Sequence, residues 1–237
     1  KYSYVSSDYL LGSSQGGLLQ PIQQQTWSLV WHEDNPLGKS NTFFALHPYY
    51  SELEGTMYFG ADWDTVVDLI ARSKVDYNSP DKLMSGSPCE QIVQHESAIV
   101  GLYDIPPGTR FPHLNTFFSR DLTNRVEDPS GWIFAQGGPT YIAYRPFVAG
   151  EWRPTDWTGL LAGGAGAWIS SGHNEWGTGH QVYVSEAPQN GYVTQIASAA
   201  DFESFAAFQA AVKALPLKFS LQPVASATFT TLDGAVV

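Results

Sequence analysis

The chain has 237 residues, of which 43% are hydrophobic and only 15% are charged, and its formal net charge is −11. This composition excludes a disordered chain, and the negative charge argues against a general affinity for DNA, RNA or anionic membranes. No segment approaches the roughly 20 apolar residues of a membrane-spanning helix, and Cys89, the single cysteine, cannot form an intrachain disulfide. A polyanionic ligand would therefore need a locally basic cleft.

Short runs of alternating or β-branched residues predict several strands in the first 60 residues. The candidates are residues 2–5, 25–31, 41–46 and 56–59. A first helix is predicted over residues 62–73, because its apolar residues share one face behind an aspartate that can cap the helix.

The strongest strand signals lie between residues 91 and 148. Residues 91–105 form an apolar, β-branched run that ends at two prolines and a glycine. Residues 131–135 and 140–147 then face each other across Gln136-Gly137-Gly138-Pro139, where glycine can adopt a positive φ angle and proline interrupts the ladder. This pattern predicts a β-hairpin.

The C-terminal part of the chain predicts a second helix followed by two strands. Residues 201–215 place apolar side chains at helical spacing, Ser198 with Asp201 resembles a capping box, and Pro216 marks the helix end. The strands are expected over residues 218–223 and 227–232. No repeat of fixed period is present, which excludes propellers and solenoids.

Together these elements predict an all-β fold: a mainly antiparallel, supersandwich-like β-sandwich with two short helices. We expect residues 1–237 to form a single β-rich domain. Both ends of the chain have a strand-like pattern, so we also expect the chain to be a fragment of a larger protein.

The aromatic content favours carbohydrate as the ligand. Eight Trp, 12 Tyr and 13 Phe residues supply flat faces beyond what a core of this size usually needs. Trp157 and Trp176 are the candidates for stacking on a sugar ring. Catalytic signatures of other classes are weak: the chain has no Gly-x-Ser-x-Gly elbow, and its carboxylate pairs, such as Glu127 and Asp128, are of the kind that is usually solvated.

Three stretches resemble a known group of proteins. Residues 9–17, 90–106 and 128–134 look like the C-terminal β-sheet region of heparinase II/III-like polysaccharide lyases, which are large secreted microbial proteins. The resemblance implies an antiparallel β-sandwich, an α/α toroid upstream or on another chain, and a sugar cleft between the two. It implies a secreted or periplasmic location, a polysaccharide or oligosaccharide as partner, and cleavage of uronate-containing glycans by β-elimination.

Elimination from a uronate needs a base, an acid and a group that neutralises the carboxylate. Tyr9, His32 and His95 are the candidates for the first two roles. A tyrosine at the edge of the core, a solvated turn and a hydrogen-bonded core histidine are the respective alternatives. The candidates for binding the uronate are the arginines Arg110, Arg120, Arg145 and Arg153.

No cofactor is expected, although a structural metal ion could bind His173, Glu175 and His180 in a glycine-bearing loop. A polar loop is the alternative there, because the spacing matches no known ligand motif. The sequence thus predicts the β-domain of a polysaccharide lyase, with a non-catalytic carbohydrate-binding module, or a structural domain that braces a catalytic partner, as the alternatives.

Overall fold

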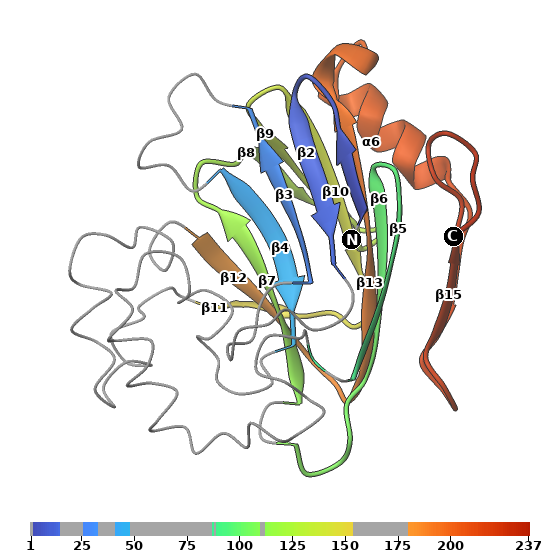
Figure 1. Cartoon of the computed structure of the whole chain (residues 1–237). Coiled ribbons are helices and arrows are strands. Elements are labelled where there is room, and N and C mark those ends of the chain that lie inside the picture. Colours follow the sequence, from blue (N-terminus) through green and yellow to red (C-terminus); the bar gives the residue numbers. More distant parts are fainter. Residues whose placement is uncertain are drawn as a thin grey trace, which may run out of the picture.

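The computed structural model describes residues 2–14, 26–32, 41–47, 87, 89–109, 112–153 and 180–237. Within these ranges the chain forms two large antiparallel β-sheets, which confirms the predicted all-β, antiparallel sandwich. Figure 1 shows the sheets facing each other, with the helix α6 (Phe205–Ala214) and the strand β15 (Ser226–Phe229) on one outer side. None of the described helices is long and apolar enough to span a membrane.

The first sheet has seven strands in the order β1-β2-β3-β4-β7-β12-β11. In strand β3, Trp27, Leu29 and Trp31 point into the core while Val30 is exposed. This alternation is typical of a strand with one buried face, because successive side chains point to opposite faces of the sheet. The strands are β1 (Tyr2–Val5), β2 (Tyr9–Ser13), β3 (Trp27–Trp31), β4 (Thr42–Leu46), β7 (His113–Ser119), β12 (His180–Glu186) and β11 (Glu151–Arg153).

The second sheet has six strands in the order β5-β6-β13-β10-β9-β8. The predicted hairpin is present, since Thr140 pairs with Gly137 across a two-residue turn in which Gly138 has a φ angle of 53°. A positive φ is what the turns of tight hairpins require. The strands are β5 (Glu90–His95), β6 (Ala98–Asp104), β13 (Gln189–Ser198), β10 (Thr140–Pro146), β9 (Ile133–Gly137) and β8 (Thr123–Glu127).

The space between the sheets holds a core rich in aromatic residues, and this core contains polar groups. Tyr192 accepts a hydrogen bond from Trp27 Nε1 at 2.5 Å, and its hydroxyl lies 3.2 Å from that of Tyr103. Glu90 starts β5 opposite Tyr103, and its Oε1 atom is buried without a hydrogen bond to any described residue. Burial raises the pKa of Glu90 to about 8, and the nearby Thr26 and Tyr103 offset only part of this effect.

The outer face of the six-stranded sheet is covered by the C-terminal part of the chain. Phe208 and Val212 of α6 are fully buried against this face, together with Phe229 of β15 (Ser226–Phe229). Strand β15 pairs with β14 (Leu217–Ser220) in a separate two-stranded sheet. The predicted strands after Pro216 therefore exist, but they end earlier than expected.

The C-terminal helix begins later than the sequence predicted. Residues Ala199–Asp201 form a single 3₁₀ turn, and Ser198 makes no capping hydrogen bond with its side chain. The helix α6 starts at Phe205, and the Ser204 side chain caps it by accepting a hydrogen bond from the Ala207 N–H at 3.1 Å. The proposed capping box of Ser198 and Asp201 is therefore wrong. The first predicted helix, at residues 62–73, and the strand at 56–59 lie outside the described residues.

Replacing Ser204 with alanine should lower the free energy of unfolding by about 1 kcal/mol, because the Ala207 N–H would lose its acceptor. Urea denaturation followed by circular dichroism measures this loss. Ser198→Ala is the matched control and should have a smaller effect. If Ser198→Ala lost more unfolding free energy than Ser204→Ala, Ser198 and not Ser204 would be the residue that caps the helix.

Candidate functional site

A pocket of about 510 Å³ opens where the chain crosses from the seven-stranded sheet to the six-stranded one. It lies at the end of β7, beside the start of β12 and along the edge strand β8. Its size falls in the range typical of small-molecule sites. The described residues that line this pocket, which we call the arginine pocket, are Ser119, Arg120, Leu122, Arg125 and Gln181.

A tight turn places Arg120 at this pocket. The Leu122 N–H donates to the Ser119 carbonyl at 3.3 Å, which closes the turn, and the Asp121 N–H donates to Ser119 Oγ at 3.1 Å. Ser119 itself is buried, so the turn is fixed to the sheet from which it emerges. Arg120 is exposed on this anchored turn.

Arg125 reaches the pocket because β8 contains a β-bulge. The register with β9 shifts between Thr123 and Val126, and Asn124 has a φ angle of 52°. A bulge inserts one extra residue in a strand and turns the neighbouring side chains in a new direction. Asn124 tolerates the left-handed conformation better than most residues do.

The guanidinium group of Arg125 is held between two side chains. It lies 4.2 Å from the ring centroid of Trp152, and its Nη1 donates a hydrogen bond to Gln181 Oε1. Trp152 is fixed in turn, since its ring packs edge-on against Phe118 and its Nε1 donates to Glu127 Oε1 at 2.7 Å. Arg125 is therefore positioned before any ligand arrives.

The charges at the pocket can recognise an anion. Two guanidinium groups provide planar donors that match the geometry of a carboxylate. Glu127 is engaged by Trp152, while Asp121 lies exposed in the turn itself. The described lining of the pocket holds two arginines and no carboxylate, in a chain whose net charge is −11.

The predicted arginines have different surroundings. Arg120 lines the pocket, whereas Arg145 of β10 donates to the carbonyls of Gly131 and Pro146 at 3.2 and 3.0 Å. Burial lowers the pKa of Arg145, and its contacts are those of a residue that holds the loop before β9 in place. Arg153 belongs to β11, but its side chain is outside the described part, as is the whole of Arg110.

Tyr9 on β2 and His32, just after the neighbouring strand β3, face different environments. Tyr9 pairs with Trp31 and is buried in the core, where burial raises its pKa. His32 follows directly after β3, is exposed, and donates its backbone N–H to the Asp8 carbonyl at 2.6 Å. Neither residue lines the arginine pocket, so the structure does not bring these two candidates to it.

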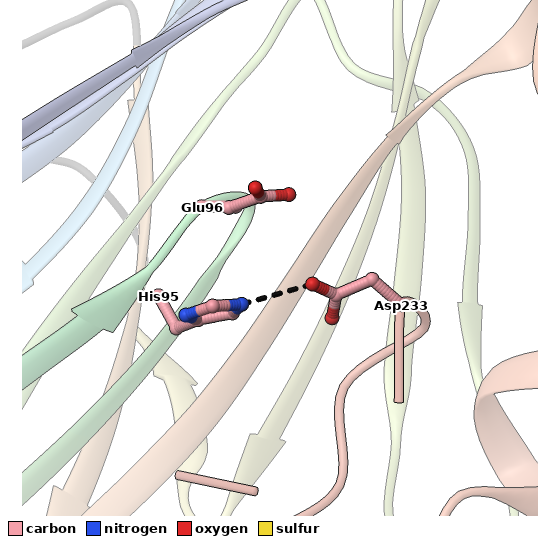
Figure 2. Close-up of side chains that lie close together, drawn as sticks. All are labelled: His95, Glu96 and Asp233. Carbon is pink, nitrogen blue, oxygen red and sulfur yellow. Dashed lines mark hydrogen bonds and ion pairs between the residues drawn. The ribbon is translucent and has the colours of Figure 1, made fainter. Parts of the chain in front are cut away.

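His95 ends β5, which is the edge strand of the six-stranded sheet opposite β8. Its Nε2 lies 2.9 Å from Asp233 Oδ2, and Figure 2 shows Glu96 beside this pair. The histidine is partly exposed and paired with a carboxylate, rather than buried in the core as its sequence context suggested.

Several predicted residues fall outside the part of the chain that the structure describes. They are Trp157, Trp176, His173 and Glu175. His180 begins β12, although its side chain is not described, so the predicted metal loop stays a prediction.

The sequence analysis did not identify Arg125, Glu96 or Asp233 as site residues. Arg125 follows Arg120 by five residues across a turn, and this spacing was the one signal that could have suggested a shared site.

Searches of protein families, curated proteins and solved structures give no match for this chain.

Proposed function

We propose that this chain is the β-domain of a carbohydrate-active protein and that the arginine pocket binds the carboxylate of a uronate in an acidic glycan. The observation that carries the proposal is the pairing of Arg120 and Arg125 at one pocket with the amide of Gln181 and the hydroxyl of Ser119. Guanidinium groups bind carboxylates through paired hydrogen bonds, and amide and hydroxyl groups suit the sugar hydroxyls.

The fixed position of Arg125 favours specific binding over diffuse attraction. Because Trp152 and Gln181 already hold the guanidinium group, less side-chain entropy is lost when a ligand binds. A polyanion can also be attracted locally even though the chain as a whole is acidic.

Cleavage by β-elimination is the second candidate, and it rests on the same pocket. Neutralising the uronate carboxylate is one of the three roles that the reaction needs, and two arginines can fill it. The described lining contains no imidazole or phenol for the base and acid roles. Binding is therefore the function that this geometry supports best, and lyase activity is the extension to be tested.

The test is calorimetric titration of the full chain with oligogalacturonate. Arg120→Ala and Arg125→Ala should each weaken binding roughly ten- to hundredfold, because each removes a hydrogen bond between charged groups. Lys218→Ala, which removes an exposed cation from β14, is the matched control and should bind like the native chain. A neutral oligosaccharide of the same length should bind more weakly than the uronate.

Two further measurements distinguish a carboxylate ligand from a sulfate ligand, and a lyase from a binding module. Dextran sulfate carries sulfate groups and no carboxylate. Equal or tighter binding of that polymer would therefore contradict the proposal that the pocket recognises a uronate carboxylate. Native affinity in both arginine variants would remove the pocket from the function. Unsaturated uronyl products absorb ultraviolet light, and a rise in absorbance that depends on Arg120 and Arg125 would favour the lyase over the binding module.

A further inference from the structure

The turn between β5 and β6 and the loop after β15 bring together three side chains that can bind a metal ion. His95 ends β5, Glu96 is the first residue of the turn, and Asp233 lies 138 positions after His95 in the chain. Their donor atoms all lie within 4.8 Å of one another, and Figure 2 shows the imidazole and the two carboxylates around a common space.

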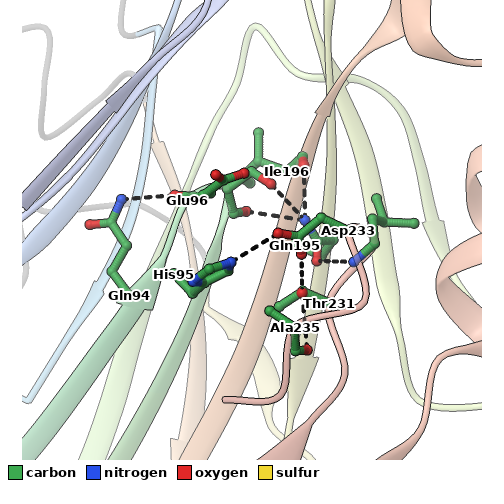
Figure 3. Close-up of polar contacts among 10 residues, drawn as sticks. Gln94, His95, Glu96, Gln195, Ile196, Thr231, Asp233 and Ala235 are labelled. Carbon is green, nitrogen blue, oxygen red and sulfur yellow. Dashed lines mark hydrogen bonds and ion pairs between the residues drawn. The ribbon is translucent and has the colours of Figure 1, made fainter.

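A buried glutamine fixes the two segments that carry these residues. Gln195 of β13 is fully buried, and its Nε2 donates to Ser97 Oγ in the β5–β6 turn at 2.9 Å. Its Oε1 accepts from the Leu232 N–H at 3.2 Å, so the same side chain also holds the C-terminal loop (Figure 3). The fold therefore holds together the two backbone segments that carry the three donors.

The orientation of Asp233 is set by a neighbour that does not itself belong to the cluster. Thr231 is buried, and its hydroxyl donates a hydrogen bond to Asp233 Oδ1 while Oδ2 faces His95. Carboxylates that bind metals are commonly held in this way by a hydrogen bond to the second oxygen.

The ion pair between His95 and Asp233 does not explain why the Glu96 carboxylate lies next to it. The Glu96 carboxylate has no hydrogen bond or ion pair with any described residue, and it lies beside the negative charge of Asp233. Glu96 also has a φ angle of 43°, a conformation in which glycine or asparagine is usual. The imidazole and the two carboxylates are the kinds of donor that bind a divalent cation.

We propose that His95, Glu96 and Asp233 bind a divalent transition-metal ion, with Zn²⁺ as the probe, and that water completes the coordination. Imidazole and carboxylate together suit Zn²⁺, whereas Ca²⁺ prefers oxygen ligands alone. Zinc bonds of about 2.0–2.1 Å place tetrahedral donors roughly 3.3 Å apart. The His95–Asp233 separation of 2.9 Å and the 4.8 Å limit of the cluster lie on either side of that value, so small rotations suffice. The ion would fasten the C-terminal loop to the β5–β6 turn.

The experiment is calorimetric titration of the metal-free full chain with Zn²⁺ alone. The native chain should bind one ion at this site. His95→Ala, Glu96→Gln and Asp233→Asn should each lower the affinity at least about tenfold, since even the loss of an outer partner costs that much. Glu96→Gln is the decisive variant, because the Glu96 carboxylate makes no contact that the fold needs and its removal should leave the circular dichroism spectrum unchanged.

Two controls make the outcome unambiguous. The double variant His173→Ala/His180→Ala should keep the site, and Ca²⁺ should not replace Zn²⁺. Hydrogen exchange of residues 230–237 should slow when Zn²⁺ is added to the native chain and should not slow in Glu96→Gln. Absence of binding by the native chain, native affinity in Glu96→Gln, or loss of binding in the double histidine variant would each overturn the proposal.

Discussion

Replacing Glu90 with glutamine should stabilise the protein at alkaline pH by roughly 4 kcal/mol. The carboxyl group of Glu90 lies between the two sheets, and its burial raises its pKa from 4.5 to about 8. The folded chain therefore holds a proton that the unfolded chain releases above pH 4.5. The contribution of this bound proton to the free energy of unfolding is fully present below pH 4.5 and is lost as the pH rises towards 8.

Glutamine has nearly the shape of the protonated carboxyl group but cannot ionise. The difference in unfolding free energy between Glu90→Gln and the native chain should be small at pH 4 and should grow steadily up to pH 8. Urea denaturation at several pH values measures it. Glu203→Gln, which changes an exposed carboxylate, should show no such growth. A difference for Glu90→Gln that is the same at pH 5 and pH 8 would show that this carboxyl group is not kept neutral by burial.

Replacing Phe208 with alanine should lower the free energy of unfolding by about 3–5 kcal/mol. Phe208 is fully buried between α6 and the six-stranded sheet, and its ring centroid lies 5.4 Å from that of Tyr141 and 5.3 Å from that of Phe202. Its removal leaves a cavity in the layer that attaches the C-terminal segment to the sandwich. Urea denaturation gives the loss, and faster hydrogen exchange in α6 would locate it.

Phe205→Ala is the matched control on the same helix. Phe205 also contacts Tyr141, with ring centroids 5.1 Å apart, but it is only partly buried. The loss should therefore be about 1–2 kcal/mol. Equal losses in the two variants would contradict a close-packed layer beneath α6.

Much of the secondary structure follows from local patterns in the sequence. The alternation of Trp27, Leu29 and Trp31 predicts a half-buried strand because successive side chains of a strand point to opposite faces. The hairpin of β9 and β10 follows from the glycines and the proline between two apolar runs, since these residues suit the turn directly. These features depend only on neighbours in the chain.

The helix start shows where local patterns become ambiguous. Ser198 and Ser204 are both of a residue type that is favoured as an N-cap. Ser204 caps the helix in the structure, and Phe202 before it is extended and packs its ring against Phe208. The choice thus depends on which aromatic side chains reach the sheet.

By itself the sequence determined the fold class and the β9–β10 hairpin, because these depend on composition and on residues close in sequence. Only the tertiary structure decided which charged residues meet. Arg125 contacts Gln181 across 56 positions and His95 contacts Asp233 across 138, through strand pairings that no local pattern encodes. The raised pKa of Glu90 has the same origin, since a strand's own sequence cannot show that the opposite sheet will exclude water from its carboxyl group.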